Sequence, residues 1–272
     1  MRKTLFVCSA LVTMAAAHAA HAQPAAAAKA KVSKACGENA IPLVVGNEWV
    51  YQPVGVPGAP PPDPNDAKKF PPRAKKITID VVGVETANNV TTVQLEEDVD
   101  GRKLKTSITC TADKFTIDPQ SFFFAGEPGG AYHVEFASFE HKDGTTLKFV
   151  GGKLAGPDWR DDVVAQWKQT PSQGADAKLW QGKLEIERYF KLAGNDNILT
   201  SAGTFNNATK VTLEITGRVT LDPPDPNPSE FPANLMNKFW FADGVGIVQV
   251  QNSYGPPDYG HMYQLTSMKL QK

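Results

Sequence analysis

A long alternation of apolar and polar residues near the C-terminal end constrains the fold more than any other stretch of the chain. Its apolar members occupy alternate positions: Val211, Leu213, Ile215, Val219 and Leu221. The residues between them are polar or charged: Thr212, Glu214, Thr216 and Arg218. Because neighbouring side chains of a β-strand point to opposite faces, this pattern predicts a strand with one dry face and one wet face. Burial on one face only is typical of an antiparallel sheet.

A strand–turn–strand unit follows at residues 239–250. Asp243-Gly244 separates the aromatic run Phe239-Trp240-Phe241 from a β-branched return strand, and this dipeptide is typical of tight hairpin turns. Gly244 is therefore expected at a positive φ angle, which glycine accepts without a Cβ clash. Gly246, just inside the return strand, indicates a bulge or a close backbone approach.

Shorter alternations recur at residues 77–81, 93–99, 104–110 and 184–190. We therefore expect an all-β, mainly antiparallel fold: a twisted, curled sheet, a β-sandwich or a half-barrel. At most one short helix is expected. Residues 158–167 allow either that helix, capped by Asp158, or a strand, and the surrounding β character favours the strand.

The N-terminus has the features of a secretory signal peptide. A basic Met1-Arg2-Lys3 precedes an apolar run, and a small-x-small motif ends at Ala22, so residues 1–22 are expected to be removed by cleavage before Gln23. Residues 23–35, rich in Ala and Lys, are expected to be a disordered tail. Residues 36–272 then form a single β-rich domain. No later segment is apolar for long enough to predict a transmembrane helix.

Two long proline-rich loops interrupt this domain. The pentapeptide Pro-Pro-Asp-Pro-Asn occurs in both, at residues 61–65 and 223–227. Two related halves and a chance recurrence are both open explanations, because one repeated pentapeptide is not a repeat period.

Cys36 and Cys110 are the cysteines left after cleavage of the signal peptide. An even pair in an exported chain predicts one disulfide. The alternation that includes Ile108 also turns Cys110 toward the dry face, as a buried bridge requires. Two free buried thiols are the alternative.

Three blocks of sequence resemble those of an uncharacterised group of exported, β-rich bacterial proteins. The blocks are Pro42-Leu43-x-x-Gly46-Asn47-x-Trp49-x-Tyr51, Ala202-Gly203-Thr204-Phe205, and Trp240-Phe241-Ala242-x-Gly244-Val245-Gly246-x-Val248. They occur in the order typical of the group, whereas the long proline loops depart from it. The resemblance implies a mostly antiparallel β fold and a location in the periplasm or outside the cell, and it carries over no catalytic residue.

Residues that suggest chemistry are few. A zinc site would draw on His133, Glu135, Glu140, His141 and His261, but no His-Glu-x-x-His helix is present. Asp161-Asp162 offers two carboxylates, yet adjacent residues do not face each other across a cleft as a glycosidase requires. Nucleophile elbows and phosphate-binding glycine loops are absent from the sequence. We therefore expect no metal, no cofactor and no catalytic residue.

The aromatic residues and the charge leave a binding function as the main expectation. The formal net charge of −1 gives no electrostatic case for nucleic acid as a partner. Trp49, Tyr51 and Trp240 are expected either in the core or along an apolar groove, because a curled sheet can hold an apolar ligand. We expect a non-catalytic protein of the cell envelope that binds an apolar ligand or a protein partner. A secreted hydrolase with a site assembled from dispersed residues is the alternative.

Overall fold

The computed structural model describes residue 36 and residues 39–55, 74–112, 114–126, 134–169, 179–222, 230–253 and 261–271. The predicted signal peptide and N-terminal tail, His133 and both Pro-Pro-Asp-Pro-Asn segments lie outside these residues. The described chain contains a single four-residue helix, α1, and fifteen strands. Their bounds are β1 (Glu48–Val54), β2 (Ile77–Ala87), β3 (Val90–Val99), β4 (Arg102–Cys110), β5 (Phe115–Ile117), α1 (Phe122–Ala125), β6 (Val134–Gly144), β7 (Phe149–Val150), β8 (Lys153–Leu154), β9 (Asp158–Gln169), β10 (Gln181–Thr200), β11 (Gly203–Leu221), β12 (Glu230–Pro232), β13 (Leu235–Ala242), β14 (Gly246–Ser253) and β15 (His261–Lys269).

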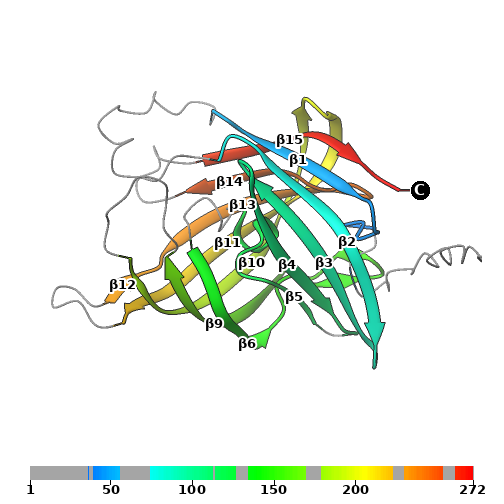
Figure 1. Cartoon of the computed structure of the whole chain (residues 1–272). Helices are drawn as coiled ribbons and strands as arrows, with labels where there is room; N and C mark the ends of the chain where they lie inside the picture. Colours follow the sequence, from blue (N-terminus) through cyan, green and yellow to red (C-terminus); the bar gives the residue numbers. More distant parts are fainter. Residues whose placement is uncertain are drawn as a thin grey trace, which may run out of the picture.

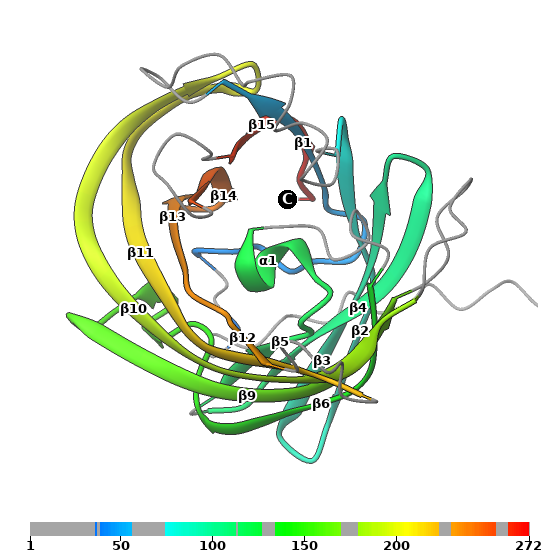
Figure 2. The ribbon, with the colours of Figure 1, turned by 90° about the vertical axis from the view of Figure 1, so that its left-hand side faces the viewer.

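The strands form one curled antiparallel sheet. Among the described residues its order is β5-β4-β3-β2-β1-β15-β14-β13-β11-β10-β9-β6, with β12 beside β11 and a separate β7–β8 hairpin. Figures 1 and 2 show that the sheet curls until it nearly closes on itself, with α1 inside the curl. The expected all-β antiparallel class and curled sheet are confirmed. In the same residues no second large sheet packs face to face against the first, so of the expected architectures the curled sheet is the one observed.

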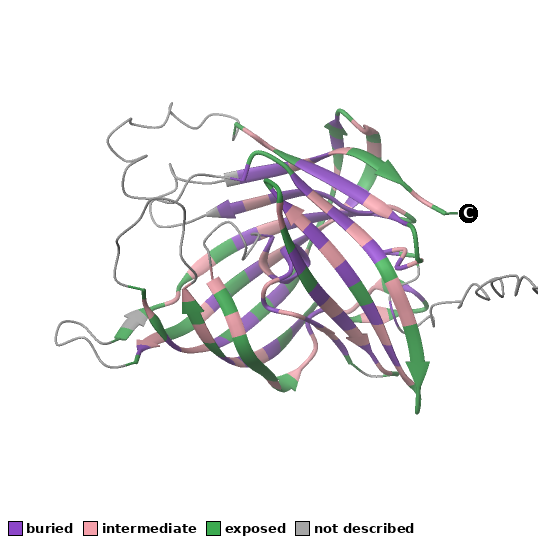
Figure 3. Cartoon of the chain, in the orientation of Figure 1, coloured by how far each residue is buried: buried purple, intermediate pink, exposed green. Residues whose placement is uncertain are grey.

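Alternating burial along the strands places the core on the concave face of the sheet (Figure 3). In β11, Val211, Leu213 and Ile215 are buried, whereas Glu214 is exposed, as the sequence pattern predicts. Residues 158–167 lie in β9, so the strand rather than the helix is confirmed for this stretch.

The predicted hairpin at Asp243-Gly244 is confirmed as the turn between β13 and β14. Gly244 has a φ of +74°, and Gly246 has a φ of +103°. The pairing of the two strands shifts register between Trp240 and Phe241, which is the bulge that Gly246 indicated. Gly246 also lies against Trp49, because a Cβ at this position would stand 3.5 Å from the indole nitrogen.

The hairpin of β10 and β11 differs from what the sequence suggests. The Asn-rich residues 195–197 are typical of a turn, but β10 continues through them to Thr200. They instead produce two register shifts against β11, between Leu192 and Asn195 and between Asp196 and Ile198. Asn and Asp are turn formers because their side chains bond the local backbone, and a bulge uses the same property. Here the Asn197 side chain bonds the backbone of the opposite strand, since Asn207 N donates to Asn197 Oδ1 at 2.9 Å.

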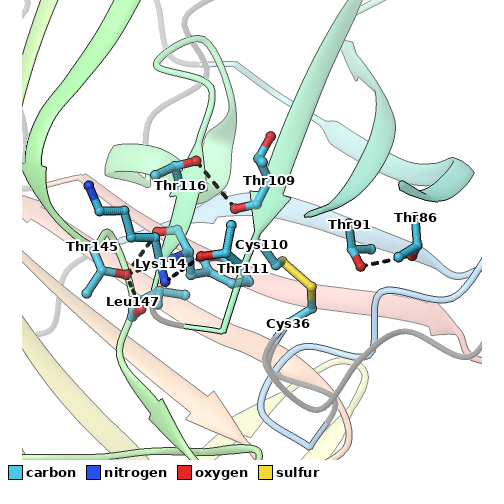
Figure 4. Close-up of a disulfide and its surroundings, with 11 residues drawn as sticks. Cys36, Thr86, Thr91, Thr109, Cys110, Thr111, Lys114, Thr116, Thr145 and Leu147 are labelled. Atoms are coloured by element: carbon cyan, nitrogen blue, oxygen red, sulfur yellow. Dashed lines mark hydrogen bonds between the residues drawn. A yellow bond between two sulfur atoms is a disulfide. The ribbon is translucent and has the colours of Figure 1, made fainter. Parts of the chain in front are cut away.

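Cys36 and Cys110 lie at disulfide distance, with Cα atoms 5.3 Å apart (Figure 4). Both residues are buried, and Cys110 ends β4 beside the short edge strand β5. The pair connects the N-terminal segment to the sheet. The bridge itself remains a prediction for chemical measurement.

No helix in the described part of the chain has the length and hydropathy needed to span a membrane.

Candidate functional site

Aromatic side chains of β1 pack on α1 inside the sheet. Trp49 and Tyr51 are fully buried. Trp49 meets Phe123 edge-on with ring centroids 5.8 Å apart, and Tyr51 meets Phe122 at 4.6 Å. The Trp49 indole N–H donates to a carbonyl of the β13–β14 turn at 2.6 Å, and the Tyr51 hydroxyl donates to a carbonyl of β14 at 2.8 Å. Both groove candidates therefore lie against protein with their polar atoms satisfied.

Little space remains between α1 and the sheet in this region. The gap bounded by Phe123, Phe124, Phe190 and Phe239 measures about 10 Å³. A single water molecule needs at least about 10–15 Å³. The aromatic rings of α1 thus occupy the volume in which an apolar ligand would have been expected.

A buried carboxylate holds the N-terminal end of α1. Glu97, on β3, accepts a hydrogen bond from the Phe122 backbone N–H at 2.9 Å and another from the Thr106 hydroxyl at 2.7 Å. Ser121 is the N-cap, and its hydroxyl accepts from Phe123 N at 3.2 Å. Burial raises the pKa of Glu97, and the hydrogen bonds from Phe122, Ser121 and Thr106 offset only part of that rise.

Three side chains of the sheet bind the C-terminal carbonyls of α1. Arg188 Nη1 donates to the Phe124 carbonyl at 2.6 Å, and its guanidinium lies 3.5 Å from the centre of the Phe124 ring. Asn237 and Asn252 donate to the carbonyls of the next two residues at 2.7 and 2.9 Å. The last carbonyls of a helix have no partner within it, so these side chains supply the bonds that the helix lacks.

Arg188 also forms a buried ion pair with Asp161. Its Nε and Nη2 atoms donate to the two carboxylate oxygens at 2.8 and 2.5 Å, and both side chains are fully buried. The Thr146 hydroxyl donates to Asp161 at 2.9 Å. Burial alone would raise the pKa of the Asp161 carboxyl, but Arg188, together with the nearby His141, holds it below its usual range. The cluster is closed to solvent, so it holds α1 in place and offers no catalytic group to a substrate.

Of the candidate zinc ligands in the described residues, His141 alone points into the interior. Its Nδ1 lies 3.6 Å from Asp161 Oδ2, and its Nε2 lies 3.2 Å from the Ile117 carbonyl. Glu135 and Glu140 are on the surface beside lysines, while His133 and the side chain of His261 lie outside the described residues. Within the described part of the chain, no three His, Cys, Asp or Glu side chains gather as metal ligands.

The two carboxylates of Asp161-Asp162 point to opposite faces of β9, as neighbours in a strand must. Asp161 is buried, whereas Asp162 faces outward near Arg160 at 3.6 Å. They therefore do not face each other across a cleft. Trp159, two residues earlier, is buried and stacked on Phe190 with ring centroids 5.4 Å apart, so it offers no open surface on which a sugar could stack.

The outer face of the sheet carries an open groove. A trough of about 590 Å³ crosses β9, β10 and β11 and reaches β13. Outward side chains that lie opposite one another on neighbouring strands form a row across the sheet. One such row forms one wall of the trough, and the next outward row forms the other wall. The first wall holds Asp158, Lys191 and Thr212, and the second holds Arg160, Tyr189, Glu214 and Met236. We call this groove the outer trough.

The outer trough offers both charge and apolar surface. Tyr189 and Met236 are 41% and 52% exposed. The Tyr189 hydroxyl donates to Glu187 at 2.7 Å, and Arg160 lies beside Asp162. A second groove of about 550 Å³ follows on the same face, around Asp162, Glu185, Glu187 and Arg218. Figure 2 shows that β10 and β11, which contribute to both grooves, bend along their length.

Trp240, the third groove candidate, is on the outer face but is covered. It is 6% exposed, and its indole N–H donates to Asp196 Oδ2 at 2.8 Å. Lys210 donates to the same oxygen at 2.8 Å. Asp196 comes from the far end of the β10–β11 hairpin, whereas Lys210 lies opposite Trp240 in the pairing of β11 with β13.

Glu97 and Arg188 were not among the candidates from the sequence, although the signal was present. Glu97 falls in phase with Val93, Leu95 and Val99, and Arg188 falls in phase with Ile186 and Phe190. A charge on the dry phase of a strand requires a buried partner. Both charged side chains bind α1, and the run Phe122-Phe123-Phe124 did not allow this helix to be predicted.

No protein-family model matches the chain, and no curated protein sequence does either. Solved structures do resemble it. A predicted exported protein with a YmcC-like fold from Bacteroides fragilis aligns with 85% of this chain and 99% of its own, at 14% identity and a TM-score of 0.53. A predicted lipoprotein from Parabacteroides distasonis aligns over the same shares at 15% identity and a TM-score of 0.48. The similarity to the Bacteroides fragilis protein shows that the two chains share a fold.

Proposed function

We propose that the chain is an exported, non-catalytic β protein of the cell envelope that binds a protein partner in the outer trough. The observation that carries the proposal is the combination of tight aromatic packing around α1, against Trp49 and Tyr51, with an open trough on the outer face. The tight packing around α1 supports a protein partner over an apolar ligand in that region. The Asp161 side chain is itself fully buried, which gives the hydrolase alternative no support.

The lining of the trough suits a polypeptide. Tyr, Met and Arg are enriched where proteins meet, because they combine apolar area with a polar end or an adaptable shape. Tyr189, Met236 and Arg160 stand on one wall. Asp158 and Lys191 stand opposite and supply charges of both signs, which can fix the orientation of a partner.

The proposal of export is supported by the N-terminal residues and by the predicted exported protein that shares the fold. N-terminal sequencing of the protein recovered from the periplasm or the medium should begin at Gln23. A chain that keeps Met1, or one that carries a lipid on Cys8, would contradict cleavage after Ala22.

A photo-crosslinking amino acid tests the trough. Placed at Met236 in the producing cell, it should yield one dominant protein adduct. Placed at Val82, which is 53% exposed on β2 and outside both grooves, it should not. The purified partner should bind the wild-type chain, and Arg160→Glu should weaken that binding at least tenfold. A lipid adduct at Met236 would favour the apolar-ligand alternative, and equal adducts from both positions would refute the trough.

A further inference from the structure

The far end of the β10–β11 hairpin lies over the outside of the sheet. The pairing of β11 with β13 runs from Thr209 to Ile215, so residues 195–208 leave the sheet and pair with each other. We call residues 195–208 the arm. Figure 2 shows the two strands bending around the outside of the sheet. The Leu199 carbonyl in the arm accepts a bond from Gln264 of β15 at 3.5 Å, so the arm reaches across β13 and β14 to β15.

Both strands of the hairpin have a bend where the arm begins. The pairing of β10 with β11 shifts register twice, between Leu192 and Asn195 and between Asp196 and Ile198. Gly194 has a φ of +93° and open space within 4 Å of the position that a Cβ would take, and Asn207 has a φ of +60°. Bulges disrupt the ladder locally and bend the strand, so the hairpin is less regular here than on either side.

Few polar contacts hold the arm down in the described residues. The carboxylate of Asp196 accepts from Trp240 Nε1 and from Lys210 Nζ, both at 2.8 Å. The Asp196 side chain is 41% exposed, so water competes for these bonds. The hydrogen bonds from Lys210 and Trp240 lower the pKa of Asp196, which agrees with a charged group that both donors stabilise.

The face under the arm is not an ordinary solvent face. Trp240 and Gln249 are 6% and 8% exposed, and both lie on the outer side of their strands. Gln264 donates to Gln249 at 2.7 Å between the two strands. Without the arm, this part of β13, β14 and β15 would present an indole ring and paired amides to water.

We propose that the arm is a strap that lifts about the bend at Gly194 and Asn207 while the rest of the sheet stays folded, and that Asp196 is its latch. Lifting keeps the hydrogen bonds between the two strands of the arm and breaks only its contacts with β13 to β15. Within residues 195–208 the buried residues are Ile198, Thr200 and Ala208, and the others are partly or fully exposed. Regions that have few buried contacts open locally at a lower free energy than the whole protein unfolds. The strap thereby controls access to Trp240.

Thiol labelling measures this opening directly. A cysteine at Gln249 lies under the arm, whereas a cysteine at Val211 lies in the core on the concave face. Under native conditions Gln249→Cys should react at least tenfold faster than Val211→Cys. Adding Asp196→Ala should raise the Gln249→Cys rate about tenfold again and leave Val211→Cys unchanged, since a hydrogen bond to a charged group is worth about that factor. Asp158→Ala, which removes an exposed carboxylate elsewhere on the sheet, should change neither rate.

Equal rates at the two cysteines would overturn the proposal, because the arm would then open only on global unfolding. An Asp196→Ala effect of the same size at both positions would also overturn it. Acrylamide quenching of the chain without added cysteines gives an independent measurement. The Trp240 signal, taken as the difference from Trp240→Phe, should become more quenchable in Asp196→Ala, and an unchanged signal would count against the latch.

Discussion

Replacing Arg188 by Met should reverse part of the pH dependence of stability. The substitution removes both bonds from the guanidinium to Asp161 and the bond to the Phe124 carbonyl. Removing one partner of a buried ion pair typically costs about 3–5 kcal/mol, because the other charge stays buried without compensation. Met keeps an apolar stem against the Phe124 ring, so the loss falls mainly on the electrostatics.

The sign of the pH effect follows from Asp161. In the wild-type chain its pKa is lowered on folding, so its stabilising contribution is present above the unfolded value of 3.8 and is lost as the pH falls through the folded pKa. In Arg188→Met, burial dominates and raises that pKa, so the carboxylate destabilises the fold increasingly as the pH rises. The difference in free energy of unfolding between the two chains should therefore be larger at pH 7 than at pH 4.

Urea unfolding at several pH values checks this prediction. Arg188→Met/Asp161→Leu is the matched control, because it removes both charges and should recover most of the stability at pH 7. A cost below about 1 kcal/mol for Arg188→Met, or a cost that does not depend on pH, would refute the reasoning.

Three further predictions concern the interior and the turns. Glu97→Gln should stabilise the chain relative to wild type as the pH rises from 5 to 8, because the raised pKa of Glu97 makes its ionisation oppose folding; urea unfolding that shows parallel pH profiles would contradict this. Intact-mass measurement should show that reduction adds two hydrogens, one each at Cys36 and Cys110. The bridge closes a loop of 74 residues and should add about 4 kcal/mol to the free energy of unfolding. Two alkylatable thiols in the oxidised protein would exclude it. Gly126→Ala should lower the free energy of unfolding by about 1–3 kcal/mol more than Gly244→Ala, as measured by thermal unfolding. A Cβ at Gly126 would clash with Val250, whereas a Cβ at Gly244 has no atom within 4 Å. Equal losses would show that the side chains around Gly126 can move to accommodate the methyl group.

The strand pattern could be predicted from the sequence because it depends on local alternation. Val211, Leu213 and Ile215 identify the dry face of β11 with no knowledge of what covers it. The turn at Asp243-Gly244 is equally local, since a positive φ is a property of one residue. Such features need only neighbours in the chain.

Neither the outer trough nor the contacts around α1 could be predicted in the same way, because their members meet across long sequence separations. Phe122 and Glu97 come from different elements, and Arg188 reaches α1 from 64 residues away. The sequence allows Trp240 to be either core or groove; it is covered from outside by Asp196, 44 residues earlier. That arrangement depends on a hairpin long enough to pass the edge of its neighbour, and strand length is not encoded in any single motif.

The pairing of β1 with β15 also sets the order in which the chain can fold. Glu48 lies opposite Lys269, and the same ladder continues to Val54 and Met262. β10 and β11, by contrast, are joined by a short turn and can pair as soon as both have been synthesised. Since contacts between distant residues form late, β1 cannot pair with β15 until residues 261–269 have been synthesised. Until then β1 presents an unpaired edge, and this interval is when a chaperone that binds extended segments would protect the chain from aggregation.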